Sequence, residues 1–459
     1  MKQVDFEHGR TLTNIFKTAL PMLVAQILNL LYNIVDRIYI ARIPRIGTQA
    51  LGAVGLCFPI VILITAFTNM YGSGGAPLFS IARGRKDREE ARQIQNTSFF
   101  LLVITSLLLI IIGELLGRPI LSVFGTSDAS MVYALPYLRI YLLGTVFSMI
   151  ATGMNPFITA QGFSTVAMTT VIVGAAANIV FDPLFIFVFG FGVEGAAIAT
   201  IISQGLSAVY VLKFLFGKKC EYQLKLLSVE EIKNCGFRSA KIIGLGTAGF
   251  MTYFTNAVVQ ISCNSVLAHV GGDIYVSVMT IVNSARQMME TPIIAISEGT
   301  SPIISYNYGA HKFDKIKKSI AIMFSLEMGY TICVWLIIRF APSAVIGIFT
   351  SDKTILKDTI PAFNLYFSTF VFMVFQYVGQ IVFKSLGRKG HAIFFSLFRK
   401  IVIVAPLTYI LPYAFNMGTN GVFAAEPISN VVGGMACFIT MLIVLNKVIK
   451  REQSGKLDF

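Results

Sequence analysis

Charged residues are scarce in this chain of 459 residues. They make up 13% of the sequence, whereas hydrophobic residues make up 55%. A soluble domain carries about 25% charged residues, which it needs to cover its surface with groups that water solvates. The composition therefore excludes an ordinary soluble protein and predicts an all-α integral membrane protein.

Motifs for catalysis, cofactor binding and ATP hydrolysis are missing as well. The four histidines and six cysteines form no CxxC pair and no metal-binding spacing, and no HExxH or Ser/His/Asp arrangement is present. A phosphate-binding G-x-x-x-x-G-K-[ST] loop is also absent, which excludes an ATP-driven pump within this chain. We therefore expect no enzyme, no catalytic residues, no cofactor and no certain metal site. The first 20 residues lack the apolar core of a signal peptide, so we expect no cleavage there.

Long apolar stretches are abundant. A helix that crosses a membrane needs about 20 mainly apolar residues. Twelve stretches reach that length: 14–41, 50–82, 94–117, 131–153, 164–189, 193–216, 240–268, 274–308, 316–340, 355–384, 392–415 and 420–449. Prolines interrupt many of them, which membrane helices tolerate where the break packs on protein or lines a cavity.

Lysine and arginine are concentrated in alternate loops. The basic loops are 83–92, 213–241, 312–318 and 384–389. Three of the opposite loops hold no Lys or Arg, and these are 190–192, 269–273 and 416–419. Basic loops stay in the cytoplasm, so both termini are predicted to be cytoplasmic in a multi-pass protein of the plasma membrane. The net charge of +14 is thus explained by topology, and we expect no nucleic-acid partner.

The two halves of the sequence repeat. GGAPLFSIARG at 74–84 matches GTSPIISYNYG at 299–309, 225 residues later, and the pairs Tyr141/Tyr366 and Gly162/Gly387 keep that offset. A further block, 190–204, matches 416–430 at an offset of 226. Six spans per half bring both halves into the membrane from the same side, which predicts two parallel repeats. We expect an N-terminal six-helix lobe at 1–216, a cytoplasmic linker at 217–239 and a C-terminal six-helix lobe at 240–459.

Polar groups at membrane depth are the candidate functional residues, because each costs roughly 2.5–3.5 kcal/mol to insert if charged. In the first half these are Asp36, Asn178, Asp182 and Thr200. Asn29, Tyr32, Asn33 and Asp36 form one stripe on the first span, and Asn178 and Asp182 share a helix face. Two carboxylates, an amide and a hydroxyl offer hard oxygen ligands for sodium, and two close carboxylates could instead hold a proton.

Simpler interpretations of these residues stay open. Asp182 could only cap a helix break before Pro183, Asp36 could pair with Arg37 or Arg42, and Thr200 alone could serve packing. The second half does not copy this site, since Asp36, Asn178 and Asp182 are matched there by Ile261, Val404 and Thr408, none of which is a carboxylate. The sodium ion or proton is therefore expected to bind in the N-terminal lobe.

The second half carries its own charged residues at membrane depth. Arg286 and Glu290 are one helical turn apart, Glu298 follows on the same span, and Glu426 starts the last span. They could attract a cationic substrate, or Arg286 and Glu290 could neutralise each other. We interpret Arg286 as the clearest buried cation and expect carboxylates to outnumber basic groups in the central spans.

These blocks resemble the multidrug and toxic compound extrusion (MATE) family over nearly the whole chain, and most closely its MepA-like bacterial branch. The resemblance is carried by Pro21 and Asp36, ALGAVGL at 50–56, the two P-x-x-S-x-x-x-G blocks, N-x-x-x-D-P at 178–183 and GVEGAAIAT at 192–200. It implies a MATE-type fold of two lobes and export of lipophilic cations against inward H⁺ or Na⁺. It assigns cation binding to Asp36, Asn178, Asp182 and Thr200.

The leading hypothesis is therefore a secondary multidrug antiporter that works by alternating access of its two lobes. Substrate contacts are expected at Asn29, Tyr32, Asn33, Arg286, Glu290, Glu298 and Glu426. The expected partners are small lipophilic cations and membrane lipid, with the protein acting as a monomer. The alternative is a lipid-linked oligosaccharide flippase on a related fold, which needs basic residues in its cleft.

Overall fold

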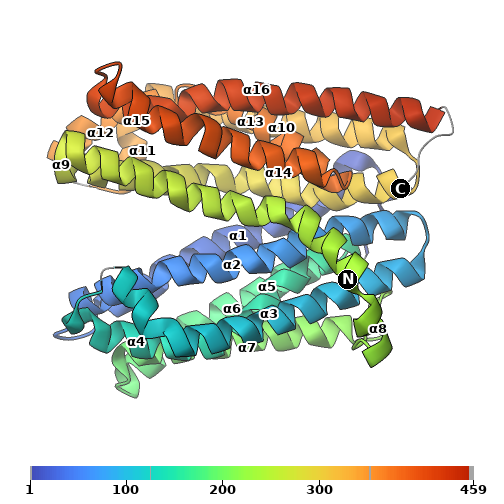
Figure 1. The fold of residues 1–459 in the computed structure, drawn as a ribbon, viewed down its shortest axis with the longest axis horizontal. Helices are drawn as coiled ribbons and strands as arrows, with labels where there is room; N and C mark the ends of the chain where they lie inside the picture. The colour runs from blue at the N-terminus through green and yellow to red at the C-terminus, as the bar shows by residue number, and fades with distance from the viewer. Residues whose placement is uncertain (1–2, 125, 351–352, 454–459) are drawn as a thin grey trace. The chain divides into compact units, whose positions relative to one another are not determined.

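The computed structural model describes residues 3–124, 126–350 and 353–453, and every regular element within them is helical (Figure 1). The first-half helices are α1 (Thr11–Ala41), α2 (Gly47–Gly84), α3 (Arg88–Val123), α4 (Asp128–Leu143), α5 (Thr145–Ala160), α6 (Ser164–Pro183), the π-helix η1 (Leu184–Val188) and α7 (Gly192–Leu215). A short α8 (Val229–Asn234) lies in the expected linker. The ends of the expected lobes, 1–2 and 454–459, lie outside the described residues.

The second half begins with α9 (Gly236–Gly309), which is broken at Gly272, where φ is 70° and ψ is −172°. The following elements are α10 (Phe313–Phe340), α11 (Pro342–Ile346), α12 (Lys353–Tyr366), the short η2 (Phe370–Phe372), α13 (Met373–Ser385), α14 (Lys389–Leu397), the π-helix η3 (Phe398–Val404), α15 (Ala405–Tyr413) and α16 (Gly418–Gln453).

The helices account for the twelve expected membrane spans. In the part of the chain that the structure describes, nine helices are long and apolar enough to cross a membrane. Two bent pairs, α4 with α5 (53°) and α12 with α13 (45°), bring the number to eleven. The twelfth span is the second half of α9, which carries the polar stripe around Arg286 and is correspondingly less apolar. The prediction of a multi-pass, all-α membrane protein with twelve spans is confirmed.

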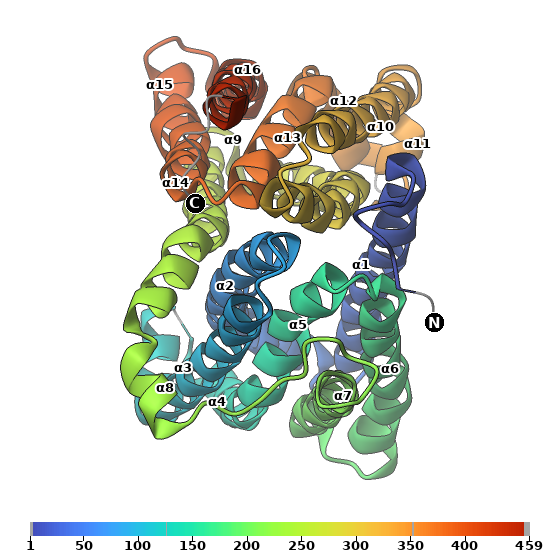
Figure 2. The same cartoon turned by 90° about the vertical axis from the view of Figure 1, so that its right-hand side faces the viewer.

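The chain folds into two compact units. Unit 1 comprises Met1–Gly9 and Leu20–Phe250, and unit 2 comprises Arg10–Ala19 and Met251–Phe459. Within unit 1, α5 packs against α2 and α7, and Figure 2 shows it between them. Within unit 2, α13 packs against both α10 and α16. Large apolar side chains on the outside of the helices, such as Leu108 and Ile111 on α3, are exposed as a lipid-facing surface requires.

The first span of each repeat begins in one unit and continues in the other. Residues 11–19 of α1 belong to unit 2, and residues 236–250 of α9 belong to unit 1. The repeated glycines make both packing contacts possible. A Cβ on Gly74 would lie 2.3 Å from the Ile242 carbonyl oxygen in unit 1, and one on Gly299 would lie 2.7 Å from Ala19 Cα in unit 2. Glycine is needed at both positions because the helices approach at backbone contact.

A second repeated pair ends equivalent helices. Gly162 follows α5 with φ 89°, and Gly387 follows α13 with φ 67°. Positive φ favours glycine, so the same turn is built at the same place in both repeats. The two six-helix repeats predicted from the sequence thus share backbone conformation as well as residue type.

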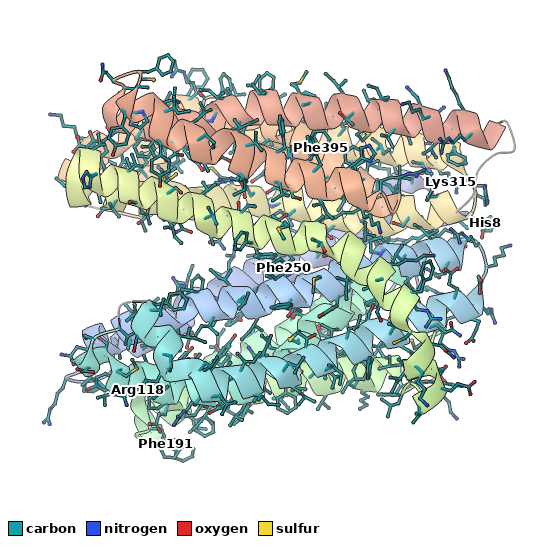
Figure 3. All side chains as sticks on the ribbon, viewed as in Figure 1. His8, Arg118, Phe191, Phe250, Lys315 and Phe395 are labelled. Carbon is teal, nitrogen blue, oxygen red and sulfur yellow. The ribbon has the colours of Figure 1, made fainter. Side chains whose placement is uncertain are left out.

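The segment after α7 is attached to unit 1 by buried hydrogen bonds. The Gln95 side chain donates to the Tyr222 carbonyl oxygen at 2.9 Å and accepts from Gln161 at 3.0 Å. The Lys225 backbone N–H donates to Asn96 at 3.0 Å. Figure 3 shows His8 at one end of unit 1, and Arg118 and Phe191 at the other.

Candidate functional site

Asp36, Asn178 and Asp182 meet inside unit 1. The side chains of Asp36 on α1 and Asp182 on α6 lie within hydrogen-bonding distance of each other. Asn178 donates its Nδ2–H to Asp182 Oδ1 at 3.0 Å, one turn away on α6. Asp182 is 0% exposed and Asn178 is 2% exposed. Two carboxyl groups so close repel each other if both are ionised, so they either share a proton or bind a metal cation.

Several oxygens around this pair have no hydrogen-bond donor among the described residues. They are Asp36 Oδ1, Asp182 Oδ2, Asn178 Oδ1 and Gln204 Oε1. Asp36 and Asp182 also form no ion pair with Lys, Arg or His in the described part of the chain. Arg37, one of the alternatives for Asp36, lies over the Phe58 ring instead, 5.1 Å from its centroid. Buried acceptors without donors are suited to bind a cation.

The helix changes its winding after Pro183, the residue that follows Asp182. Pro183 has no backbone N–H, so the α-helical hydrogen bond to the residue four positions earlier is lost. The chain continues as the π-helix η1, in which the Phe189 N–H donates to the Leu184 carbonyl oxygen at 2.9 Å. Asp182 therefore ends the regular part of α6 and also contacts Asp36, so the capping alternative does not account for all of its contacts. π-Helical turns occur often at functional sites.

Three tyrosines surround the carboxyl pair. They are Tyr32 on α1 and Tyr137 and Tyr141 on α4. Each lies close enough to Asp36 to interact electrostatically with its carboxyl group. The rings of Tyr137 and Tyr141 stack with centroids 6.1 Å apart. Sequence reasoning did not assign Tyr137 to the site, because no motif in the stretch 131–153 distinguishes this tyrosine from the other aromatic residues of the chain.

The other members of the polar stripe on α1 behave differently from Tyr32. Asn29 and Asn33 are exposed, and Asn33 donates to the Asn29 carbonyl oxygen at 2.6 Å. Tyr32 and Asp36 are half-buried and interact with each other electrostatically. The stripe thus contributes two residues to the carboxyl pair and its surroundings, and two to the surface of α1.

Thr200 lies on α7, which packs against α6. Its hydroxyl donates to the Ala196 carbonyl oxygen at 2.9 Å, and Ser203 donates to Ala199 at 2.7 Å. The Thr200 oxygen keeps its lone pairs for a ligand, although its proton serves the helix. One turn further, Gln204 lies within hydrogen-bonding distance of the Tyr141 hydroxyl.

Unit 2 contains a buried cluster of five charged side chains, here called the C-terminal charge cluster: Arg286, Glu290, Arg399, Lys400 and Glu426. Glu426 is the centre, since it contacts Lys400 at 3.0 Å, Arg286 at 3.1 Å and Arg399 at 3.4 Å. Arg286 also pairs with Glu290. Three cations and two anions leave one formal positive charge if all five are ionised.

Neutral groups complete the C-terminal charge cluster. Arg286 donates to the Tyr366 hydroxyl at 2.8 Å, and the Tyr377 hydroxyl donates to Glu290 at 3.2 Å. Arg399 donates to Asn430, and the π-helix η3 carries both Arg399 and Lys400. Glu298 lies outside this cluster, half-buried on α9.

The carboxyl pair and the C-terminal charge cluster include related positions of the repeat. Tyr141 matches Tyr366, Thr200 matches Glu426 and Gln204 matches Asn430 in the offsets found above. Each unit thus has polar residues near its own copy of the repeated tyrosine, Tyr141 in unit 1 and Tyr366 in unit 2. The charges are opposite, however, because two carboxyl groups dominate in unit 1 and three cations surround Glu426 in unit 2.

The expectation that carboxylates outnumber basic groups in the central spans does not hold within the C-terminal charge cluster, which has three basic groups and two carboxylates. Arg286 is not the clearest buried cation, because Arg399 and Lys400 are also buried. Their signal was present in the sequence, as an Arg-Lys pair in the middle of the apolar stretch 392–415. The simple interpretation of Arg286 and Glu290 as a neutralising pair is the one observed.

Comparisons with known proteins agree on one family. The profile of the MatE family matches residues 21–184 and 249–410, which is more than half of the chain. A multidrug export protein MepA of Staphylococcus haemolyticus is 25% identical over 447 residues, covering 96% of this chain and 94% of the relative. The MepA of Staphylococcus aureus strain MRSA252 is 20% identical over 444 residues, 96% of each chain.

Solved structures share the fold. A MATE crystal structure in a bent conformation superposes with a TM-score of 0.90 at 23% identity, covering 99% of both chains. A transporter from Pyrococcus furiosus, described as having a binding pocket of reverse polarity, gives a TM-score of 0.88 at 23% identity, covering 97% of this chain and 98% of that one.

Proposed function

Because this chain belongs to the MATE family of membrane transporters, we propose that it is a secondary active multidrug exporter. It exports lipophilic cations in exchange for H⁺ or Na⁺, by alternating access of its two lobes. The lobes 1–216 and 240–459, joined by a cytoplasmic linker at 217–239, are the moving parts of this proposal. The relatives named MepA support multidrug export, and the internal repeat supports alternating access.

The observation that carries the proposal is the pair of Asp36 and Asp182, of which Asp182 is fully buried and Asp36 is half-buried. An ionised carboxylate at membrane depth is expensive unless it is neutralised. Here two carboxyl groups face each other with no cationic side chain bonded to either in the described residues. A proton or a sodium ion is the neutralising partner we propose.

The coupling site then consists of Asp36, Asn178, Asp182 and Thr200. Asn178 orients Asp182, and Thr200 supplies a hydroxyl oxygen from the neighbouring helix α7. If sodium is the coupling ion, these oxygens form its site, since hard cations prefer oxygen ligands. If a proton is the coupling ion, the two carboxyl groups share it. No cofactor is required in either case.

Substrate contacts are proposed at two places. Asn29 and Asn33 expose amides on α1, and Tyr32 offers an aromatic face for a lipophilic cation beside Asp36. Glu298 is the half-buried carboxylate of unit 2 outside the C-terminal charge cluster, and it could attract a cation. Within that cluster, Arg286 forms ion pairs with Glu290 and Glu426. These ion pairs make the two glutamates less available to bind a cationic substrate.

A second function is favoured by the C-terminal charge cluster. A flippase for lipid-linked oligosaccharides must hold phosphate groups, and three buried cations suit phosphate. Against it, Lys400 and Arg399 already contact Glu426, and Arg286 contacts both glutamates. An anionic substrate would have to displace these contacts, so cation export is the better-supported proposal.

Ethidium efflux from proteoliposomes tests the function. A pH gradient and a sodium gradient are imposed separately, with each ion balanced in the other experiment. We expect ethidium to move against its own gradient when one of the two is present. If neither gradient drives ethidium transport, and the protein instead transports a lipid-linked sugar phosphate, the flippase function is favoured. For the site of action we propose the plasma membrane, with both termini cytoplasmic and the monomer as the working unit.

A further inference from the structure

Glu327 is a buried carboxyl group that neither the carboxyl pair nor the C-terminal charge cluster includes. It lies near the middle of α10, in unit 2, and is 0% exposed. Ser297 on α9 donates its hydroxyl to Glu327 Oε1 at 2.7 Å. The other carboxyl oxygen, Oε2, is buried and has no partner among the described residues.

Glu426 offers a direct comparison within the same unit. Both glutamates are buried in membrane spans, but Glu426 contacts three cations at 3.0–3.4 Å. In the described part of the chain, no Lys, Arg or His lies within ion-pair distance of Glu327. The protein thus stabilises an ionised carboxylate at Glu426 and supplies nothing comparable at Glu327.

The titratable groups on the elements around α10 do not change this. On residues 280–309 of α9 they are Arg286, Glu290, Glu298, Tyr306 and Tyr308, and on α13 they are Tyr377 and Lys384. On residues 418–451 of α16, whose Phe438 contacts Phe324 of α10, they are Glu426, Cys437, Lys447, Lys450 and Arg451. Neither α11 nor η2 carries one. Arg286 is bound to Glu290 and Glu426, and Tyr377 is bound to Glu290. On α10 itself, Tyr330 donates to the Met289 carbonyl oxygen.

The ligand of such a carboxyl group follows from its chemistry. A carboxylate transferred to an apolar interior without a counter-ion costs far more than a neutral acid does. A metal cation is a poor solution here, because one carboxyl and one hydroxyl supply fewer oxygens than the roughly six that a hard cation takes. A proton needs no further ligand and removes the charge completely.

We propose that Glu327 is a second proton-binding site of this protein, separate from Asp36 and Asp182. It holds its proton while it is buried against Ser297, and it exchanges that proton when helix movement during export brings water to it. The bound proton follows from the surroundings of Glu327 alone, whereas the exchange step rests on the proposed export function.

Carbodiimide labelling tests the bound proton. Dicyclohexylcarbodiimide is apolar and reacts with protonated carboxyl groups in membranes. The carboxyl oxygen bonds to the central carbon, the acid proton moves to a nitrogen, and an acyl shift from oxygen to nitrogen leaves a stable N-acylurea. Peptide mass spectrometry of the purified full chain at pH 7 should find this adduct on Glu327 and not on Glu426.

Infrared spectroscopy gives a second readout that does not depend on access of the reagent. The carbonyl band of a protonated carboxyl group should be present in the wild type and lost in Glu327→Gln. An unlabelled Glu327 together with an unchanged band in Glu327→Gln would overturn the bound proton.

The exchange step is tested with the same variant. Glu327→Gln keeps the shape of the side chain and removes no charge, so its melting temperature should stay at the wild-type value. If the proton is exchanged, gradient-driven export should fall at least tenfold and its pH dependence should change. Export at the wild-type rate with an unchanged pH profile would assign Glu327 a structural role only.

A failure of the proposed export function is distinguishable from a failure of this inference. Asp182→Asn alters the proposed coupling site and leaves Glu327 untouched. Glu327 should be labelled equally in Asp182→Asn and in wild type, whether or not either protein exports ethidium. Labelling that disappears in Asp182→Asn would show that the two sites are not separate.

Discussion

Asn178 donates its side-chain N–H to Asp182 Oδ1 at 3.0 Å inside unit 1. Both side chains are buried, so water does not compete for this hydrogen bond. A hydrogen bond to a charged group contributes about 1.5–3 kcal/mol. If Asn178 orients Asp182 for the coupling ion, Asn178→Leu should weaken ion binding by roughly ten- to a hundredfold. The ion concentration that half-activates export measures this.

Asn69→Leu is the matched control, because Asn69 is also a helical asparagine but donates to the Thr65 carbonyl oxygen of its own helix α2. Its half-activating ion concentration should stay close to that of the wild type. Equal effects of both substitutions would show that the bond to Asp182 has no special role.

The C-terminal charge cluster predicts a loss of stability. Glu426→Gln would remove the carboxylate that contacts three buried cations. Breaking a buried ion pair from one side costs about 3–5 kcal/mol, so the melting temperature in detergent should fall strongly. Glu290→Gln should lower it less, because Arg286 keeps Glu426 as a partner. Dye affinity measured on the same Glu290→Gln sample should be unchanged, and a clear loss would assign Glu290 to substrate binding.

The repeated close contacts of α2 and α9 predict a paired effect. Gly74→Ala and Gly299→Ala each place a Cβ within 2.3–2.7 Å of another helix backbone. Overpacking of this kind costs about 1–3 kcal/mol, which a thermal melt can detect. Gly55→Ala on α2 and Gly329→Ala on α10 meet nothing within 4 Å and should melt like the wild type. A wild-type melting temperature for all four variants would contradict the observed contacts.

The proposed topology can be tested with an introduced cysteine. Cys220 is a poor reporter, because burial makes it inaccessible and raises its pKa to about 11, so little thiolate forms near neutral pH. Val229 at the start of α8 is 72% exposed. In a background without reactive cysteines, Val229→Cys should react with an impermeant maleimide only after cells are permeabilised.

Phe191→Cys, in a loop free of Lys and Arg, is the counterpart and should react in intact cells. The reverse labelling pattern would place the termini outside and overturn the charge-based orientation.

Much of the fold was predictable because its signals are local. Apolar length and loop charge marked the twelve spans, and recurring glycines such as Gly162 and Gly387 marked the repeat. The meeting of Asp36 with Asp182 was predictable only through the family resemblance, since the two residues lie on different helices. Helical periodicity does show that Asn178 and Asp182 share a face.

The charged residues that sequence reasoning missed share one property. Arg399, Lys400 and Glu327 are charged residues in otherwise apolar stretches, the same signal that identified Asp36. What the sequence does not contain is their partners, because Lys400 meets Glu426 and Glu327 meets Ser297 across helices. Partners decide whether a buried charge is neutralised within the protein or is available to a ligand.

The central claim is that Asp36 and Asp182 couple ion movement to export. It is tested most directly by comparing two transport modes of Asp36→Asn and Asp182→Asn in proteoliposomes. Exchange of labelled for unlabelled ethidium needs no ion gradient, whereas accumulation against a gradient does. The account predicts that both variants insert and exchange ethidium, yet fail to accumulate it under an imposed pH or sodium gradient. Accumulation at the wild-type level by both variants would contradict it.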